Sequence, residues 1–388
     1  MTPLGQLLRD ADPDRVVEVA ADYVRLMFPG CVVDVLLADY RISGLWPVLR
    51  DLHSSAGWLH EQSAAARAFA SQHTVIEDVA GGTARALIPL SIWCERVGVL
   101  AIDTETTPTS TQLAEFAAVA DDLAVALLAA DRTTDRYRRT RRRQRLTMAA
   151  EMQWELLPGR ALGGPGFNLA GQLEPAYAVC GDHFDWSLND QRLTLTALNG
   201  DGTGIAATLL TAVAINAMRN ARRSGAGLVE QAELASDAIF SLHGGKHHVA
   251  TLLLEVDLTS GVIDLIDAGS PRLLRLRGTQ VSRIDVDHQL PLGMFADTRY
   301  APQQFALDAD DRLFIVSDGV HGAAPGGRPA FGERALVTAV RATRLQPVTE
   351  AVGGLMRGLH NYHDGHDLDD DAVIVCLDWL GKASEGKQ

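Results

Sequence analysis

The chain has 388 residues, 47% of them hydrophobic and 22% charged, which is an ordinary composition for a globular protein. Its length exceeds the usual size of one hydrophobic core, so we expect two domains. The net charge of −14 argues against a general nucleic-acid-binding protein. The chain lacks both a long apolar run and a basic, signal-like start, which argues against membrane insertion and predicts a cytoplasmic protein.

Residues 1–130 predict a small α+β domain. Apolar residues recur at helical intervals over 14–27 and 63–72, and a further helix begins at Ser110. Between these helices the sequence predicts strands, listed here by range: 31–40, 74–79, 84–93 and 95–105. The element order over residues 10–130 resembles a GAF domain, a sensory module that often carries a small ligand on its sheet. This resemblance implies a sensor domain with a small-molecule ligand.

Two aromatic and two histidine side chains of this domain are candidates for the lining of a ligand pocket. They are Trp46, His53, Trp58 and His60. Core packing or an exposed helix explains the same residues more simply. No cofactor can be named from them.

Residues 131–160 predict an arginine-rich helical linker. Its arginines lie at positions 132, 136, 138, 139, 141, 142, 143 and 145. Basic runs can bind phosphate backbones, but in an acidic protein a solvated helix that continues the preceding one is the favoured interpretation. Leu146, Ala149 or Ala150, Gln153 and Leu156 then form a short apolar seam, which predicts that two chains pair as a homodimer.

Residues 161–381 predict the second domain, followed by a disordered tail at 382–388. Its most informative stretch is 193–210, an apolar strand, a turn with glycines at 200, 202 and 204, and a helix. Glycines permit positive φ and close approach of a ligand, and a helix N-terminus offers N–H groups to an anion. Gly202, Gly204 and Ala207 also fit a dinucleotide-binding fingerprint, but antiparallel-looking strands follow, which disfavours that interpretation.

Several acidic side chains and one amide stand at the ends of apolar segments in this domain. They are Asp182, Asn199, Asp201, Asp318, Asp369, Asp370 and Asp371. Buried acids are costly unless they pair or bind a cation, and oxygen-rich clusters suit Mg²⁺ or Mn²⁺. Each Asp-Gly alone is more often a turn former. Together they indicate a metal site.

The order of these motifs is similar to that of the PPM-type, RsbU/SpoIIE-like protein phosphatases. The matching blocks are Glu155-Leu156-Leu157-Pro158, Gly181-Asp182, Phe184-Asp185, the glycine turn at 199–207, residues 249–257, Ala268-Gly269, Pro291-Leu292-Gly293, Ser317-Asp318-Gly319-Val320 and Asp370-Asp371-Ala372-Val373. The resemblance covers about residues 150–380. It implies an αββα sandwich with two Mn²⁺ or Mg²⁺ ions between its sheets.

By the same resemblance, Asp182, Asp318 and Asp370 are metal or metal-water ligands and catalytic residues, and the Gly200 carbonyl supplies another oxygen. The implied activity is hydrolysis of phosphoserine or phosphothreonine by an activated water. The implied substrate is a phosphorylated STAS-type anti-sigma-factor antagonist, under control of the sensor domain.

Asn199 departs from the family pattern, because the family usually has an aspartate there that bridges both metals. An amide offers one neutral oxygen in place of two anionic ones, so metal affinity should fall. Either Asp201 compensates through a shifted loop, or one metal is lost. The rival function is therefore a catalytically weakened binding module. Ser270 and Gly322 also depart from the pattern, at positions that are not metal ligands.

The remaining polar candidates have simpler structural explanations. His247 and His248 precede a predicted strand, and because neighbouring residues on a strand point to opposite faces, a turn or surface role is favoured over metal binding. Arg219, Arg222 and Arg223 lie near a helix C-terminus, whose dipole they complement. No nucleophile elbow is present. The cysteines, at 31, 94, 180 and 376, lack CxxC spacing, and we expect free, buried thiols.

Overall fold

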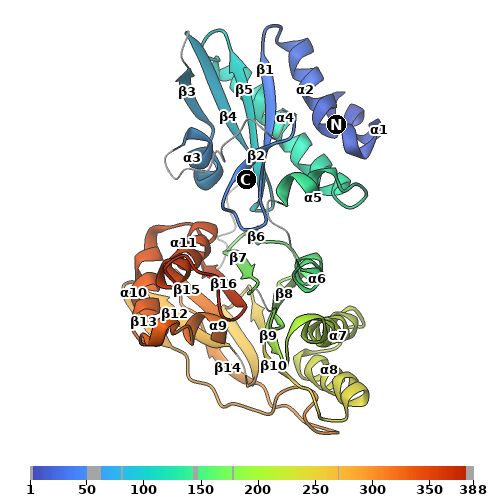
Figure 1. Cartoon of the computed structure of the whole chain (residues 1–388), viewed down its shortest axis with the longest axis vertical. Coiled ribbons are helices and arrows are strands. Elements are labelled where there is room, and N and C mark those ends of the chain that lie inside the picture. Colours follow the sequence, from blue (N-terminus) through green and yellow to red (C-terminus); the bar gives the residue numbers. More distant parts are fainter. Residues whose placement is uncertain are drawn as a thin grey trace. The chain divides into compact units, whose positions relative to one another are not determined.

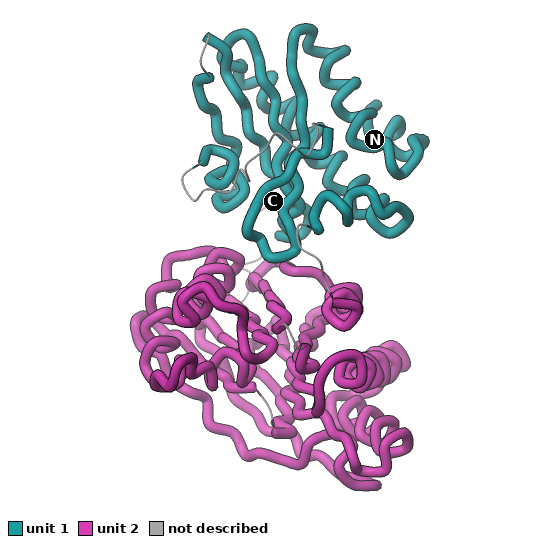
Figure 2. Tube along the Cα trace, viewed as in Figure 1, with its two compact units in different colours: residues 1–145 teal, residues 146–388 magenta. Residues whose placement is uncertain are grey.

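The computed structural model describes residues 3–49, 63–79, 82–142, 147–176, 179–269 and 271–381. These residues fall into two compact units, residues 1–145 and residues 146–388 (Figure 2). His53, Trp58, His60, Leu146, Ser270 and the tail at 382–388 lie outside the described residues. None of the described helices combines the length and hydropathy that crossing a membrane requires.

Unit 1 is built on one five-stranded antiparallel sheet in the order β2-β1-β5-β4-β3 (Figure 1). Its strands are β1 (Val32–Ala38), β2 (Leu45–Pro47), β3 (Val75–Val79), β4 (Thr83–Ile92) and β5 (Glu95–Thr104). Its helices are α1 (Pro3–Asp10), α2 (Val16–Met27), α3 (Ala64–Ser71), α4 (Ser110–Ala130) and α5 (Arg136–Arg141). Helices α1, α2 and α4 share one core with the sheet, and α3 packs on a second core. The predicted helices and strands of 1–130 are thereby confirmed.

Helix α4 shows why the sequence pattern was sufficient in this unit. Thr109 and Gln112 form a capping box that fixes the start of the helix. Phe116, Leu123 and Leu127 recur at helical spacing and are buried against the sheet.

The prediction that all four thiols are buried was wrong for Cys94. Trp93 and Cys94 form the tight turn between β4 and β5, with φ of 48° and 71°. Cys94 is exposed at this turn, whereas Cys376 is buried in the other unit. Cys31 and Cys180 are partly buried, and all four thiols are free.

The arginine-rich segment is not the continuous helical extension that the sequence predicted. Helix α4 ends at Ala130, the chain turns, and α5 packs back onto unit 1. Arg136 pairs with Glu18, and the Arg141 guanidinium donates to the Ala38 carbonyl at 3.0 Å. These arginines therefore have structural partners within their own unit.

Unit 2 is an αββα sandwich, as predicted (Figure 1). One antiparallel sheet has the order β14-β11-β10-β9-β8 and the other β13-β12-β15-β16-β7-β6. The strands are β6 (Ala161–Gly164), β7 (Phe167–Glu174), β8 (Asp182–Asn189), β9 (Arg192–Gly200), β10 (Val249–Asp257), β11 (Val262–Ala268), β12 (Arg272–Arg277), β13 (Gln280–Arg283), β14 (Gln303–Ala306), β15 (Asp311–Val316) and β16 (Ala372–Trp379). A core that includes Phe184, Leu252 and Val375 fills the space between the sheets.

Helices cover the two outer faces of the sandwich. They are α6 (Met148–Leu156), α7 (Gly204–Arg223), α8 (Leu228–His243), α9 (Asp318–His321), α10 (Ala335–Ala342) and α11 (Val348–Tyr362). Helices α7 and α8 share a core with the β8–β11 sheet, and α10 and α11 share one with the other sheet. Every strand pair is antiparallel among the described residues, so the dinucleotide-binding interpretation of the glycine turn is excluded.

The apolar seam predicted to pair two chains packs inside unit 2. Ala149 and Ala150 form a small buried cluster with Val179, and Gln153 is also buried. These side chains are not available to a second chain. Pairing of two chains stays a prediction, but it no longer has this surface as its basis.

Candidate metal centre

One edge of the sandwich collects the acidic residues that the sequence singled out. Asp182 is the first residue of β8 and lies opposite Asn199 near the end of β9. Asp318 follows β15, and Asp370 precedes the neighbouring β16. The described part of 176–180 is not a strand, and Asp182 stands at a strand end because it begins β8.

Asp182 is a buried carboxylate that the described residues leave without a hydrogen bond. It is 0% exposed, and neither carboxylate oxygen has a hydrogen-bond partner. Burial first, and then the negative charge of Asp318, raise the pKa of Asp182 well above its ordinary value. A weak hydrogen-bonding interaction with the Ser317 hydroxyl lowers the pKa and opposes this shift, although its geometry falls short of a regular hydrogen bond. A buried group of this kind requires neutralisation, by a proton or by a cation.

Asp370 belongs to the same electrostatic cluster. Burial and the charge of Asp318 raise its pKa, while the Cys180 thiol and the Asp371 amide oppose the change. In turn, burial and then the charge of Asp370 raise the pKa of Cys180 to about 12. Cys180 is therefore a protonated thiol that donates to Asp370, which makes it a poor nucleophile.

Asn199 is in direct contact with one of these carboxylates. Its Nδ2 donates a hydrogen bond to Asp318 Oδ1 at 2.8 Å. The amide thus presents a donor to the cluster, where an aspartate would present a fourth negative charge. Asp201 does not replace that charge, because its carboxylate lies 3.0 Å from His247 Nδ1 instead.

Asp371 looks like Asp370 in the sequence but has a structural role. Its carboxylate accepts hydrogen bonds from the backbone amides of Ala176, Cys180 and Gly181 at 2.8–3.0 Å, and from Gln153 Nε2 at 2.8 Å. It therefore fixes the loop that leads into Asp182. Asp369, the third acid of the run, is exposed.

Glycines allow the backbone segments of this edge to approach each other. A Cβ on Gly181 would lie 2.8 Å from the Gly200 carbonyl oxygen, and one on Gly319 would lie 1.9 Å from the Asp371 carbonyl oxygen. Gly202 and Gly204 have open space around them but φ of 99° and 67°, so they serve the turn conformation. The Gly204 amide already donates to the Val179 carbonyl, so it is not free for an anion.

The helix arginines also have a role that the sequence did not predict. Arg219 and Arg222 pair with the buried Asp185 of β8, at 2.7 and 3.2 Å. They therefore neutralise a buried acid and do more than complement a helix dipole.

The donor set fits a divalent cation only in part. The described residues contain no group of three or more His, Cys, Asp or Glu side chains arranged as metal ligands. However, the two unpartnered oxygens of Asp182, with Asp318 and Asp370 nearby, supply the hard anionic oxygens that Mg²⁺ and Mn²⁺ prefer.

Residues 189–380 match the family of stage II sporulation protein E (SpoIIE). Phosphoserine phosphatase RsbP of Bacillus subtilis (strain 168) is 20% identical over 197 residues, which cover 50% of this chain and 47% of that protein. The chain thus spans about half the length of this curated relative.

Among solved structures, similar chains include the RsbU and RsbW domains of Rv1364c from Mycobacterium tuberculosis. That comparison has 21% identity, a TM-score of 0.49, and coverage of 57% of this chain and 63% of that one. The SiaA-PP2C domain of Pseudomonas aeruginosa has 18% sequence identity and a TM-score of 0.48, and the comparison covers 54% of this chain and 85% of that one.

Proposed function

Because residues 189–380 match the SpoIIE family, we propose that unit 2 is a metal-dependent protein serine/threonine phosphatase. The observation that carries this proposal is the carboxylate of Asp182, which is fully buried and unpartnered beside Asp318 and Asp370. Binding of a cation there would offset the desolvation penalty of burying this charge.

In this proposal Asp182, Asp318 and Asp370 hold Mn²⁺ or Mg²⁺, and the Gly200 carbonyl contributes a further oxygen. A cation bound there would supply Lewis-acid activation of a water for attack on a phosphoryl group near neutral pH. Asn199 lowers the negative charge of the site by one relative to an aspartate. Asp371 keeps the loop before Asp182 in place through its backbone hydrogen bonds.

The substrate we propose is a phosphorylated STAS-type regulatory protein in bacterial signalling. The curated relative is named a phosphoserine phosphatase, which supports phosphoserine as the reacting group. We further propose that unit 1 is a GAF-like sensor that controls the phosphatase and that the protein acts in the cytoplasm. The five-stranded sheet of unit 1, with helices on both faces, is compatible with such a sensor.

The test is hydrolysis of a generic aryl phosphate and of a phosphoserine STAS protein across a Mn²⁺ titration. We expect manganese-dependent turnover in the wild-type chain and its loss in Asp318→Asn. The matched control is Asp369→Asn, which changes an exposed aspartate that directly precedes Asp370 in the sequence. Turnover that survives in Asp318→Asn would contradict the proposal.

A second function is favoured by the hydrogen bond between Asn199 and Asp318. Since this amide occupies an oxygen of a proposed ligand, the chain could serve as a phosphatase-like binding module that reports the state of its sensor without turnover. In that case the wild type is inactive, and Asn199→Asp creates manganese-dependent activity. Equal activity of the wild type and Asn199→Asp would exclude this alternative.

A further inference from the structure

Two arginines lie on the outer face of the second sheet, close to the helix that begins with Asp318. Arg272 starts β12 and lies opposite Val316 of β15, two residues before Asp318. Arg283 ends the edge strand β13 and lies opposite Leu274 of β12 (Figure 1). Leu274 packs in the core that this sheet shares with α10 and α11, so the face is the outer one. Residues two apart on a strand share a face, which makes the two arginines diagonal neighbours with Cβ atoms about 7–8 Å apart.

His321 completes this group, which we call the outer cluster, and it lies in the same four-residue helix as Asp318. The chain at Gly332 covers it, since a Cβ there would lie 2.8 Å from the His321 Cβ. Burial and then the charge of Arg272 lower the pKa of His321 to about 4. Arg283 adds to this shift, and Asp318 opposes it. The imidazole is therefore neutral near pH 7, and its Nδ1 is buried without a hydrogen-bond partner among the described residues.

The positive charge of Arg272 is not balanced by any carboxylate in the part of the chain that the structure describes. Its guanidinium forms neither an ion pair nor a hydrogen bond there, and burial, followed by the charge of Arg283, lowers its pKa. Arg283 has one acidic neighbour, Asp285, which is 90% exposed and 3.6 Å away, and exposed pairs of this kind contribute little. A partly buried arginine without a counter-ion is costly, and a bound anion removes that cost.

The outer cluster lies beside the proposed metal centre and not inside it. Asp318 Oδ1 accepts a hydrogen bond from Asn199 of the other sheet, so this carboxylate points between the two sheets. Arg272 and Arg283 stand on the outer face instead. They are therefore placed to contact a group that flanks the reacting phosphate, and not the phosphate itself.

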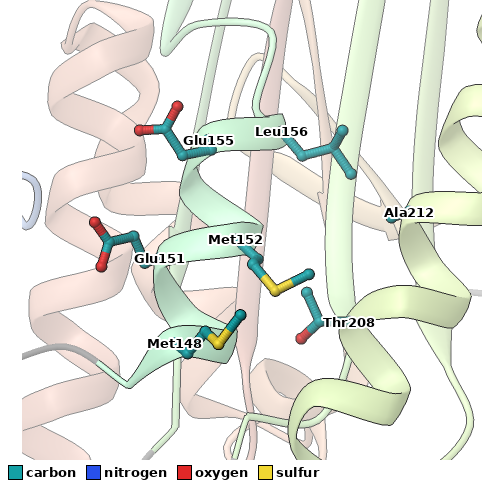
Figure 3. A pocket seen from close by; sticks show the side chains of 7 residues that line it. All are labelled: Met148, Glu151, Met152, Glu155, Leu156, Thr208 and Ala212. Atoms are coloured by element: carbon teal, nitrogen blue, oxygen red, sulfur yellow. The ribbon is translucent and has the colours of Figure 1, made fainter.

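The groove between α6 and α7 has the opposite charge. Its volume is about 550 Å³, and the carboxylates of Glu151 and Glu155 belong to its lining together with the apolar Met152 and Leu156 (Figure 3). An acidic segment of a partner would be repelled there, as it would by a chain whose net charge is −14. The outer cluster is a local exception to this negative charge.

We propose that Arg272, Arg283 and His321 bind an acidic side chain of the substrate protein next to its phosphoserine. A guanidinium offers a planar fork of donors that matches a carboxylate, and a neutral imidazole adds one N–H donor without further charge. This inference rests on the proposed function, because it names a feature of the substrate of that site.

The first test is peptide binding to the full chain in Mn²⁺, measured by fluorescence anisotropy. Two labelled peptides carry the same non-hydrolysable phosphonate analogue of phosphoserine, flanked by glutamates in one and by glutamines in the other. We expect the wild type to bind the acidic peptide about tenfold more tightly, and Arg272→Gln to lose this preference. The matched control is Arg344→Gln, which should keep it, because Arg344 is an exposed arginine near Asp311 at the other end of β15.

Equal affinity of the wild type for the two peptides would overturn the inference, and so would a preference that survives in Arg272→Gln. Arg272→Lys guards against a purely structural effect, since it keeps the charge and should retain part of the preference. Equal loss in the lysine and glutamine variants would assign the effect to packing and would also overturn the inference.

Turnover of the corresponding phosphoserine peptides separates this inference from the proposed function. We expect Arg272→Gln to lower the ratio of kcat/KM for the acidic peptide over the neutral one about tenfold, through KM. An equal fall for both peptides would place Arg272 at the phosphoryl group and overturn the inference. Wild-type protein that hydrolyses neither peptide would count against the proposed function, while the binding preference still decides the role of Arg272.

Discussion

Asp371 and Asp182 are both fully buried at the same edge of the sandwich, yet their carboxylates differ in hydrogen bonding. Asp371 accepts hydrogen bonds from three backbone amides and from Gln153, whereas neither oxygen of Asp182 has a partner among the described residues. Asp185, also buried, is a third case, because Arg219 and Arg222 neutralise it.

The difference separates structural acids from a candidate ligand. A buried carboxylate whose lone pairs are filled by donors is part of the fold, and its loss leaves donors unpaired. A buried carboxylate with empty lone pairs destabilises the fold until a cation or a proton arrives. The predictions below test this contrast.

The largest loss of folding stability is expected for Asp371→Ala. The change leaves three backbone amides and the Gln153 amide without an acceptor inside the protein, so we expect a loss of about 3–5 kcal/mol in the free energy of unfolding of unit 2. Urea denaturation of the full chain, followed by a probe of unit 2 such as hydrogen exchange, measures this loss. A loss below about 1 kcal/mol would show that Asp371 is not a structural acid.

A smaller loss is expected for Arg219→Ala. Asp185 then keeps only Arg222, and the Leu156 carbonyl loses its donor, which should cost about 2 kcal/mol. The control is Arg223→Ala on the same helix, since this exposed arginine should change stability by no more than about 0.5 kcal/mol. Equal effects of the two variants would mean that the buried ion pair contributes nothing.

For Asp182→Asn in the presence of a chelator, we expect the change in the free energy of unfolding to have the opposite sign. Replacing an unpartnered buried charge by a neutral side chain of the same shape should leave stability unchanged or raise it by about 1 kcal/mol. Thermal unfolding of the metal-free protein measures this change. A clear fall in melting temperature would indicate that Asp182 has a structural partner after all.

Adding Mn²⁺ should then make the wild type more stable than Asp182→Asn. A ligand that binds the folded state stabilises it by mass action, so at Mn²⁺ about 100 times its dissociation constant the wild type should gain about 2.7 kcal/mol. Asp182→Asn should gain far less. Equal stabilisation of both proteins would place the bound ion elsewhere.

The sequence was sufficient where local patterns decide the structure. The hairpin of β4 and β5, the helix from Ser110 and the strand at 249–257 follow from alternation, helical spacing and capping. The gathering of Asp182, Asn199 and Asp318 could also be predicted, because each stands beside a strand end and antiparallel neighbours bring such ends to one edge.

Long-range contacts explain what the sequence did not reveal. Nothing local distinguishes Asp370 from Asp371, since their partners come from residues almost 200 positions earlier in the chain. The spacing of Gln153 fits an apolar pairing seam, so the sequence predicts a contact between two chains there. A polar amide among Ala149, Ala150 and Leu156 was the available signal that this face meets polar groups. The packing of α5 within unit 1 depends on Glu18 and Ala38, which lie 118 and 103 positions before their arginine partners in the sequence.

The central claim is that the empty carboxylate of Asp182 belongs to a cation site. Calorimetric titration of Mn²⁺ into the full chain tests it most directly, with Asp182→Asn and the exposed Asp369→Asn measured beside the wild type. The account predicts saturable binding in the wild type and in Asp369→Asn, and its loss in Asp182→Asn. Binding of equal affinity in all three proteins, or in none of them, would contradict it.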